Sequence, residues 1–327
     1  MTTLLALSVF SGFFGGVDAP SKGFAAWQDT LKGKTSISAK VTVQEVGGTS
    51  NSYTIDMKKP NLLRLDTGST LVVADGKNIT TFDKKQGVYY KQPQTDEDMK
   101  VLLGDDQYSL FTGFFGDAPD LFKTEDGARK SLGGDQVLEV KGFYDKSGKK
   151  VQSFYVGSDN IAKRASITAK KQQGGDYVAV INAKDLVVNG SQADTLYAFN
   201  APDDAKEINY QDLISSKWFH DLDEAKLIAT RTHKKIFVDF MASWCGPCKM
   251  MDQTVFQTDE FKALGKGLVF CKIDIDLNPA LADQYGVEAI PNMFVIRPDG
   301  SVVGHVLGYT PADQFIPQIQ AMIDSTK

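Results

Sequence analysis

Residues 235–249 read KIFVDFMASWCGPCK, and they decide the fold of the last third of the chain. The run is apolar up to residue 241 apart from Asp239, which is typical of a buried strand. A short loop and the pair Cys245 and Cys248 follow it. A strand, a loop, a cysteine and a helix in this order place Cys245 at a helix N-terminus, where unpaired N–H groups and the helix dipole stabilise a thiolate. We therefore expect Cys245 to be a nucleophile.

The spacing of the two cysteines suits a reversible disulfide. Positions three apart on a helical turn have Cβ atoms about 5–6 Å apart, which is close enough to bridge after a small adjustment. Pro247 falls in the first turn, where its missing N–H costs nothing. A zinc site would need two further ligands, and the available side chains stand unpaired in the sequence: Cys271, His220, His233 and His305. We therefore expect thiol–disulfide exchange with no metal ion and no cofactor.

The stretch resembles thioredoxins, and the resemblance extends over residues 217–327. Asp239 matches the buried carboxylate of that family, and Lys272 matches the lysine beside it. The resemblance implies an α/β thioredoxin fold with Cys245, Cys248, Asp239 and Lys272 as catalytic residues. It also implies a cis peptide bond between Ile290 and Pro291, and a hairpin turn at Pro298-Asp299-Gly300. The residues implied to bind the client are Trp244, Gly246, Pro247, Ile290, Pro291 and Gly308.

Other positions refine this resemblance. Met241 and Gln253 depart from cytosolic thioredoxins, and the segment after Cys248 is more similar to extracytoplasmic domains such as the C-terminal domain of DsbD. Thr310 and Pro311 are expected to start the final helix as its N-cap and first residue.

Two polar or reactive residues have simpler interpretations. Asp239 could be a solvated strand residue, but its apolar neighbours favour burial. Cys271 lies in an apolar run, so a small buried hydrophobe is its default role and a redox role the alternative.

The chain before residue 203 has a different pattern, dominated by alternation of apolar and polar residues. Short alternating runs with Gly, Asp and Asn between them predict an antiparallel meander. We expect a helix over 24–32 and, after a break at 95–100, an apolar stretch of helical character over 101–115. The expected strands are 36–44, 53–58, 62–66, 70–74, 77–82, 87–92, 137–140, 152–156, 164–168, 177–181 and 194–199.

Several segments of this meander resemble the outer-membrane lipoprotein carrier (LolA-like) family. They are residues 57–64, 71–78 and 82–83, together with 196–202 as the closing strand. The resemblance implies an incomplete β-barrel, mainly antiparallel, whose helices close an apolar cavity for lipoprotein acyl chains. The residues implied to line this cavity are Leu63, Leu103, Phe111, Phe114 and Phe115. An ordinary core is the alternative interpretation of the aromatic residues.

The first residues have the pattern of a secretory signal peptide. Residues 2–16 are rich in Leu and Phe and carry no charge, and Val17-Asp18-Ala19 supplies small residues for cleavage after Ala19. This predicts a periplasmic or secreted protein. The alternative, favoured by the lack of a basic residue after Met1, is an apolar helix packed on the domain.

Composition narrows the range of functions. The 327 residues carry a formal net charge of −5, and their basic residues are scattered, which argues against a nucleic-acid partner. The three cysteines all lie in the last third, so the chain is not a disulfide-stapled scaffold.

Together these patterns predict a signal peptide over 1–19, an N-terminal domain over 20–205, a linker over 206–216 and a C-terminal domain over 217–327. The first functional hypothesis is an extracytoplasmic oxidoreductase with disulfide-containing clients and a thiol electron donor. The second is a carrier of lipid or lipoprotein acyl chains whose C-terminal domain is accessory. In a third, the N-terminal domain only docks or anchors the protein.

Overall fold

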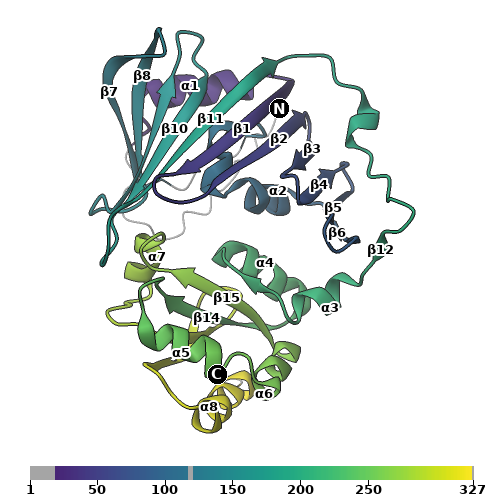
Figure 1. The fold of residues 1–327 in the computed structure, drawn as a ribbon, viewed down its shortest axis with the longest axis vertical. Helices are drawn as coiled ribbons and strands as arrows, with labels where there is room; N and C mark the ends of the chain where they lie inside the picture. Colours follow the sequence, from purple (N-terminus) through teal and green to yellow (C-terminus); the bar gives the residue numbers. More distant parts are fainter. Residues whose placement is uncertain (1–18, 117–120, 326–327) are drawn as a thin grey trace, which may run out of the picture.

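A computed structural model describes residues 19–116 and 121–325 (Figure 1). The expected signal peptide lies outside these residues apart from Ala19. Among the described residues, no helix combines the length and the apolar character needed to cross a membrane.

The N-terminal domain is built on one open sheet that has twelve strands in the described part of the chain. Its order is β12-β6-β5-β4-β3-β2-β1-β11-β10-β9-β8-β7, and neighbours are antiparallel except β12 and β6. β12 and β7 are the two edges, so the sheet does not close on itself. The strands are β1 (Ser36–Glu45), β2 (Ser50–Lys58), β3 (Leu62–Asp66), β4 (Thr70–Ala74), β5 (Asn78–Asp83), β6 (Val88–Pro93), β7 (Lys123–Leu132), β8 (Asp135–Phe143), β9 (Lys150–Val156), β10 (Ala162–Ala169), β11 (Tyr177–Val188) and β12 (Lys206–Glu207).

The strand β7 has no counterpart among the expected strands. Its sequence, KTEDGARKSL, is polar, and most of its residues are exposed because it pairs only with β8 at the edge of the sheet. A strand without a buried face leaves no alternation of apolar and polar residues in the sequence.

Helices α1 (Lys22–Lys32) and α2 (Asp96–Leu103) and the 3-10 helix η1 (Asp106–Phe111) cover the inner face of this sheet (Figure 1). The break expected at 95–100 is wrong, because α2 begins there. Thr95 caps it by accepting a hydrogen bond from the N–H of Asp98, whose carboxylate accepts one from the N–H of Thr95. This reciprocal capping satisfies helix-end donors and fixes the start of α2.

Two segments after β11 also differ from expectation. Residues 194–199 do not form a strand: Asp194–Tyr197 is a 3-10 helix, η2, held by Tyr197, whose buried hydroxyl donates to Gln192. Residues 206 and 207, expected in the linker, form β12 beside β6.

The C-terminal domain has a five-stranded sheet over the described residues, in the order β13-β15-β14-β16-β17. β13, β15 and β14 are parallel, while β16 and β17 are antiparallel to their neighbours. The strands are β13 (Trp218–Phe219), β14 (Lys235–Met241), β15 (Leu268–Asp274), β16 (Asn292–Ile296) and β17 (Val302–Leu307). Separate apolar clusters cover its two faces, so β14 in the centre is buried on both sides, as its apolar run predicted.

The helices around this sheet are α3 (Tyr210–Ile214), α4 (Leu222–Thr232), α5 (Gly246–Thr254), α6 (Asp259–Ala263), η3 (Leu264–Lys266), α7 (Pro279–Gln284) and α8 (Ala312–Asp324). The expected start of the last helix is one residue early. Pro311 has an extended ψ of 152° and takes the N-cap position, and Thr310 makes no capping bond.

The two domains are joined by an ion pair between α2 and α4. The guanidinium of Arg231 donates to both carboxylate oxygens of Asp98, at 2.6 and 2.7 Å. The Asp98 side chain is 1% exposed and that of Arg231 is 27% exposed. Nearby, the rings of Tyr90 on β6 and Tyr210 on α3 stack with centroids 5.4 Å apart.

Replacing Arg231 with methionine should lower the free energy of unfolding of the full chain by about 1–3 kcal/mol. The carboxylate of Asp98 would stay buried after losing its charged partner, and this uncompensated burial is costly. Urea denaturation measures the change. Lys226→Met is the matched control on α4, because its ion pair with the exposed Asp223 should contribute less than about 1 kcal/mol. Equal losses in both variants would show that the pair does not tie the domains together.

Candidate active site

The end of β14 and the start of α5 place the two cysteines. β14 is fixed between β15 and β16, and after Ala242 the chain turns into α5. Cys245 is the N-cap of α5, and Pro247 lies in its first turn as expected. The central strand β14 thus fixes the position of the loop that carries Cys245.

Cys245 and Cys248 form a disulfide, with their Cα atoms 5.3 Å apart. The N–H of Cys248 donates to Sγ of Cys245 at 3.1 Å. This is the helix-end donor that would stabilise a thiolate on Cys245 after reduction. Both residues are buried, at 3% and 1% exposure, so access to solvent does not distinguish Cys245 from Cys248. The assignment of Cys245 as the attacking group therefore rests on its N-cap position.

Asp239 lies on β14 and is buried, with a 1% exposed side chain. Its Oδ2 is 3.8 Å from Nζ of Lys272, and its Oδ1 has no hydrogen-bond partner. Burial raises the pKa of Asp239 to about 7, against the attraction of Lys272. Lys272 also contacts the carboxylate of Asp252 on α5, whose negative charge raises the pKa of Asp239 further. A buried carboxyl group with such a pKa can hold or release a proton near neutral pH.

The loop before β16 contains the expected cis peptide bond between Ile290 and Pro291, which the structure confirms. The carbonyl of Pro291 accepts a hydrogen bond from the N–H of Gly308 at 2.8 Å, which joins two of the expected client-binding residues. Ile290 and Trp244 pack against the apolar cluster that contains both cysteines. Gly246 and Pro247 are exposed beside them.

The sequence of this domain matches known proteins. The Thioredoxin family profile matches residues 221–321. Thioredoxin from Chlorobaculum thiosulfatiphilum is 38% identical over 91 residues, which are 28% of this chain and 81% of that protein. The chain belongs to the thioredoxin family. Thioredoxin from Bacillus subtilis is 40% identical over 78 residues, which are 24% of this chain and 72% of that protein.

Among solved structures, the oxidised C-terminal domain of DsbD from Neisseria meningitidis matches the thioredoxin domain. The match has a TM-score of 0.28 and 28% identity, and it covers 32% of this chain and 98% of that one. The matches to the thioredoxin family and the observed disulfide together show a thioredoxin-like oxidoreductase domain that contains the Cys245–Cys248 pair.

Cys271 takes no part in the disulfide, although it belongs to the same apolar cluster as Cys245 and Cys248. It is fully buried on β15, and burial raises the pKa of its thiol well above the usual range. A buried thiol that resists deprotonation behaves as a small apolar side chain, which was its default interpretation.

The expected cavity residues lie on the inner face of the N-terminal sheet and its helices. Four of them are buried in one apolar cluster: Leu63, Leu103, Phe111 and Phe114. Phe115 is partly buried and lines an open pocket of about 360 Å³ together with Pro60 and Met99. At the four buried positions the inner face is thus occupied by the domain's own side chains.

Two carboxylates near the site were not identified from the sequence. Asp252 contacts Lys272 from α5, and Oδ2 of Asp276 accepts a hydrogen bond from Nε1 of Trp244 at 2.8 Å. A sequence signal for Asp276 exists, because it comes just after β15, the parallel neighbour of β14. Carboxyl ends of adjacent parallel strands meet at one edge of a sheet, so residues after β15 lie near the cysteines.

Proposed function

We propose that this protein is an extracytoplasmic thiol–disulfide oxidoreductase that acts on disulfide-containing client proteins. The observation that carries the proposal is the Cys245–Cys248 disulfide at the start of α5, with the N–H of Cys248 directed at Sγ of Cys245. Membership of the thioredoxin family supports the same activity.

In the reducing direction, the thiolate of Cys245 attacks one sulfur of a client disulfide. A mixed disulfide forms, and the other client sulfur leaves as a thiolate that takes up a proton. Cys248 then loses its proton and attacks Sγ of Cys245. This step releases the second client thiol and leaves the Cys245–Cys248 disulfide, so two electrons have passed to the client.

Asp239 is proposed to accept the proton of Cys248 in the second step, and Lys272 to modulate the charge of Asp239. A base with a pKa of about 7 is well matched to this transfer near neutral pH. The unpaired Oδ1 of Asp239 supports the role, because a buried acceptor without a partner can receive a proton or a bridging water.

The client is proposed to lie along the loop of Ile290 and Pro291, next to Gly308, Trp244 and the exposed Gly246-Pro247 turn. An extended peptide can pair with such a backbone edge. A disulfide held there would stand beside Cys245.

The extracytoplasmic location rests on the uncharged apolar segment over residues 2–16 and the cleavage pattern that ends at Ala19. In an oxidising compartment the pair would not stay reduced unaided. A dedicated thiol donor would therefore have to return it to the dithiol state after each turnover.

An insulin-reduction assay tests the proposal, with Cys245→Ser as the inactive control. The reduction potential of the pair then sets the direction of electron flow. The Gly-Pro dipeptide between the cysteines favours a reduction potential of about −270 mV, that of thioredoxin. A potential of about −120 mV would make the protein an oxidant like DsbA. Wild-type protein that reduces no insulin and exchanges no client disulfide would refute the proposal.

A second candidate function is binding of an acyl chain or lipoprotein by the N-terminal domain, as its resemblance to lipoprotein carriers implies. The observation that favours it is a pair of buried side chains on α1. Gln28 is 5% exposed and neither atom of its amide has a hydrogen-bond partner, and Nε1 of the buried Trp27 is also unpaired. Unpaired polar atoms in an apolar interior are costly, and the head group of a ligand could pair with them.

Replacing Gln28 with leucine separates this function from a purely structural role. If the amide binds a ligand, a fluorescent fatty-acid probe should bind the variant at least tenfold more weakly than the wild type, because the hydrogen bond is lost. Mass spectrometry of co-purified lipid provides a second measurement. If neither protein binds the probe and the variant is only more stable, the N-terminal domain is a scaffold.

A further inference from the structure

The connection between β10 and β11 reaches from the N-terminal domain to the redox site. Figure 1 shows the ends of these strands beside α7, which follows Asp276 in the chain. The backbone N–H of Gln172, in this connection, donates to Oδ1 of Asp276 at 3.1 Å. The other oxygen of the same carboxylate accepts the indole N–H of Trp244 at 2.8 Å. One buried side chain therefore links the N-terminal domain to the residue that precedes Cys245.

A second contact lies beside the first. Nζ of Lys149, between β8 and β9, is 3.8 Å from Oδ1 of Asp283 on α7. The two connections are themselves joined, because the N–H of Lys170 donates to the carbonyl of Lys149 at 2.8 Å. Asp276, which precedes α7, and Asp283, near the C-terminal end of α7, thus both contact basic hairpins of the N-terminal domain.

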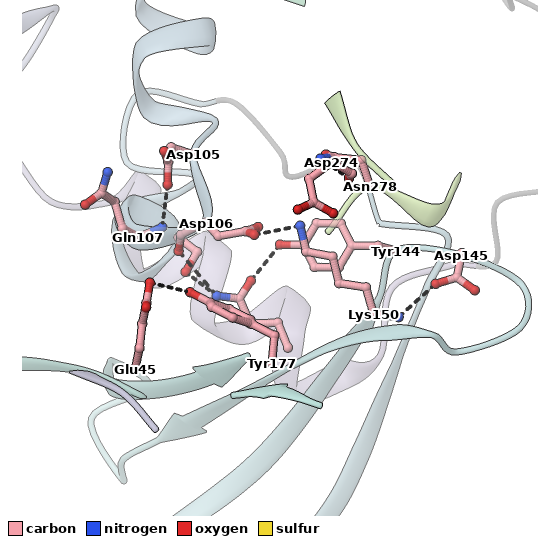
Figure 2. A network of polar contacts seen from close by, with 12 residues as sticks. Glu45, Asp105, Asp106, Gln107, Tyr144, Asp145, Lys150, Tyr177, Asp274 and Asn278 are labelled. Atoms are coloured by element: carbon pink, nitrogen blue, oxygen red, sulfur yellow. Dashed lines mark hydrogen bonds and ion pairs between the residues drawn. The ribbon is translucent and has the colours of Figure 1, made fainter. Parts of the chain in front are cut away.

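A polar network fixes the bases of these hairpins (Figure 2). The ammonium of Lys150 is 9% exposed and lies 2.6 Å from Oδ2 of Asp106, while its backbone N–H donates to Asp145. The hydroxyl of Tyr177, at the start of β11, donates to Glu45 at 3.3 Å. Because these contacts are made within the N-terminal domain, they hold the backbone at Gln172 in place independently of its hydrogen bond to Asp276.

We propose that the connection between β10 and β11, residues 170–176, is a positioning element of the redox site. Its backbone at Gln172 holds the carboxylate of Asp276, and this carboxylate sets the orientation of Trp244 beside Cys245. The N-terminal domain thereby prepares the client-binding face of the thioredoxin domain. The hydrogen bonds that Gln172 and Trp244 donate to Asp276 are observed in the structure. The inference rests on the proposed function only in assuming that Trp244 contacts the client.

The bond between Gln172 and Asp276 comes from a backbone N–H, so proline is the substitution that removes it. In full-length Gln172→Pro, the indole N–H resonance of Trp244 should shift or broaden, whereas those of Trp27 and Trp218 should not move. The value of kcat/KM for insulin should fall by about threefold to tenfold, mainly through KM, because misplacing a substrate-positioning group weakens productive binding.

Two matched variants control for side-chain and proline effects. Gln172→Ala keeps the N–H and should behave as wild type, and Gln173→Pro introduces the same ring one residue further on. If Gln172→Pro does not fold, Lys149→Glu tests the same link, because it reverses the charge that faces Asp283 at an exposed position. It should move the Trp244 resonance in the same sense.

The outcomes separate this inference from the proposed function. An unchanged Trp244 resonance and an unchanged KM in folded Gln172→Pro would overturn the inference and leave the oxidoreductase function intact. Wild-type protein without insulin reductase activity would overturn the proposed function. The Trp244 resonance would still show whether residues 170–176 set the orientation of Trp244.

Discussion

Replacing Cys248 with serine should leave client proteins attached to Cys245 as stable mixed disulfides, whereas replacing Cys245 should leave none. Cys245 caps α5 and accepts the N–H of Cys248, so its thiolate is the one that the helix end stabilises. Without Cys248 the first exchange still occurs, but the resolving step has no attacking sulfur. Turnover in the insulin assay should fall to background in both variants.

Non-reducing gel electrophoresis of extracts measures the trapped species, which a reductant should release. Cys271→Ser is the control, because this thiol is buried and its raised pKa keeps it protonated. It should neither trap clients nor lose activity. If Cys245→Ser and Cys248→Ser trapped clients equally, the assignment of attacking and resolving cysteines would be wrong.

Replacing Asp239 with asparagine should slow turnover near neutral pH by about 10²-fold, the lower end of what a positioned general base contributes. The wild-type rate should rise with pH through the pKa of Asp239, about 7, as the carboxylate becomes available to take the proton of Cys248. The variant should lose this rise. Stopped-flow measurement of client reduction between pH 6 and about pH 9 compares the two profiles.

The same substitution should stabilise the oxidised protein at alkaline pH. The folded-state pKa of Asp239 lies above the unfolded value, so the folded protein binds an extra proton between about pH 4 and 7. This contribution to stability is present in full below the unfolded pKa and is lost as pH rises through about 7. Asparagine stays neutral, so Asp239→Asn should gain on the order of 2–4 kcal/mol at alkaline pH.

Asp252→Asn provides a discriminating control. It removes a negative charge that raises the pKa of Asp239 and frees Lys272 to face Asp239 alone. The rise in rate should therefore move to lower pH while its height stays the same. Identical pH profiles in wild type, Asp239→Asn and Asp252→Asn would show that Asp239 is structural only.

The thioredoxin domain was largely predictable because its determinants are local in sequence. The apolar run of β14, the loop and the capped helix α5 adjoin one another, and the structure reproduces the expected strand from Lys235 to Met241. The partnership of Asp239 and Lys272 followed from the resemblance, and the two residues are direct neighbours in the parallel register of β14 and β15.

The contacts between the domains were not predictable in this way. Asp98 and Arg231, or Gln172 and Asp276, are single polar residues on elements far apart in the chain, and no periodicity connects them. The start of α2 is a different case, because Thr95 and Asp98 have the spacing of a capping pair that the sequence displays. The strand β7 left no apolar signal to find.

The short strand β12 limits where the redox pair can go. A flexible linker over residues 206–216 would let the thioredoxin domain range over about 18 Å. Instead, the N–H of Lys206 donates to Gly87 and that of Ile208 to Tyr89, so the chain is bonded to the edge of β6 until just before α3. The Cys245–Cys248 pair is therefore not carried on a flexible linker. Client disulfides must diffuse to the pair. The rate of exchange should therefore depend on how clients reach the site rather than on how far the thioredoxin domain can move.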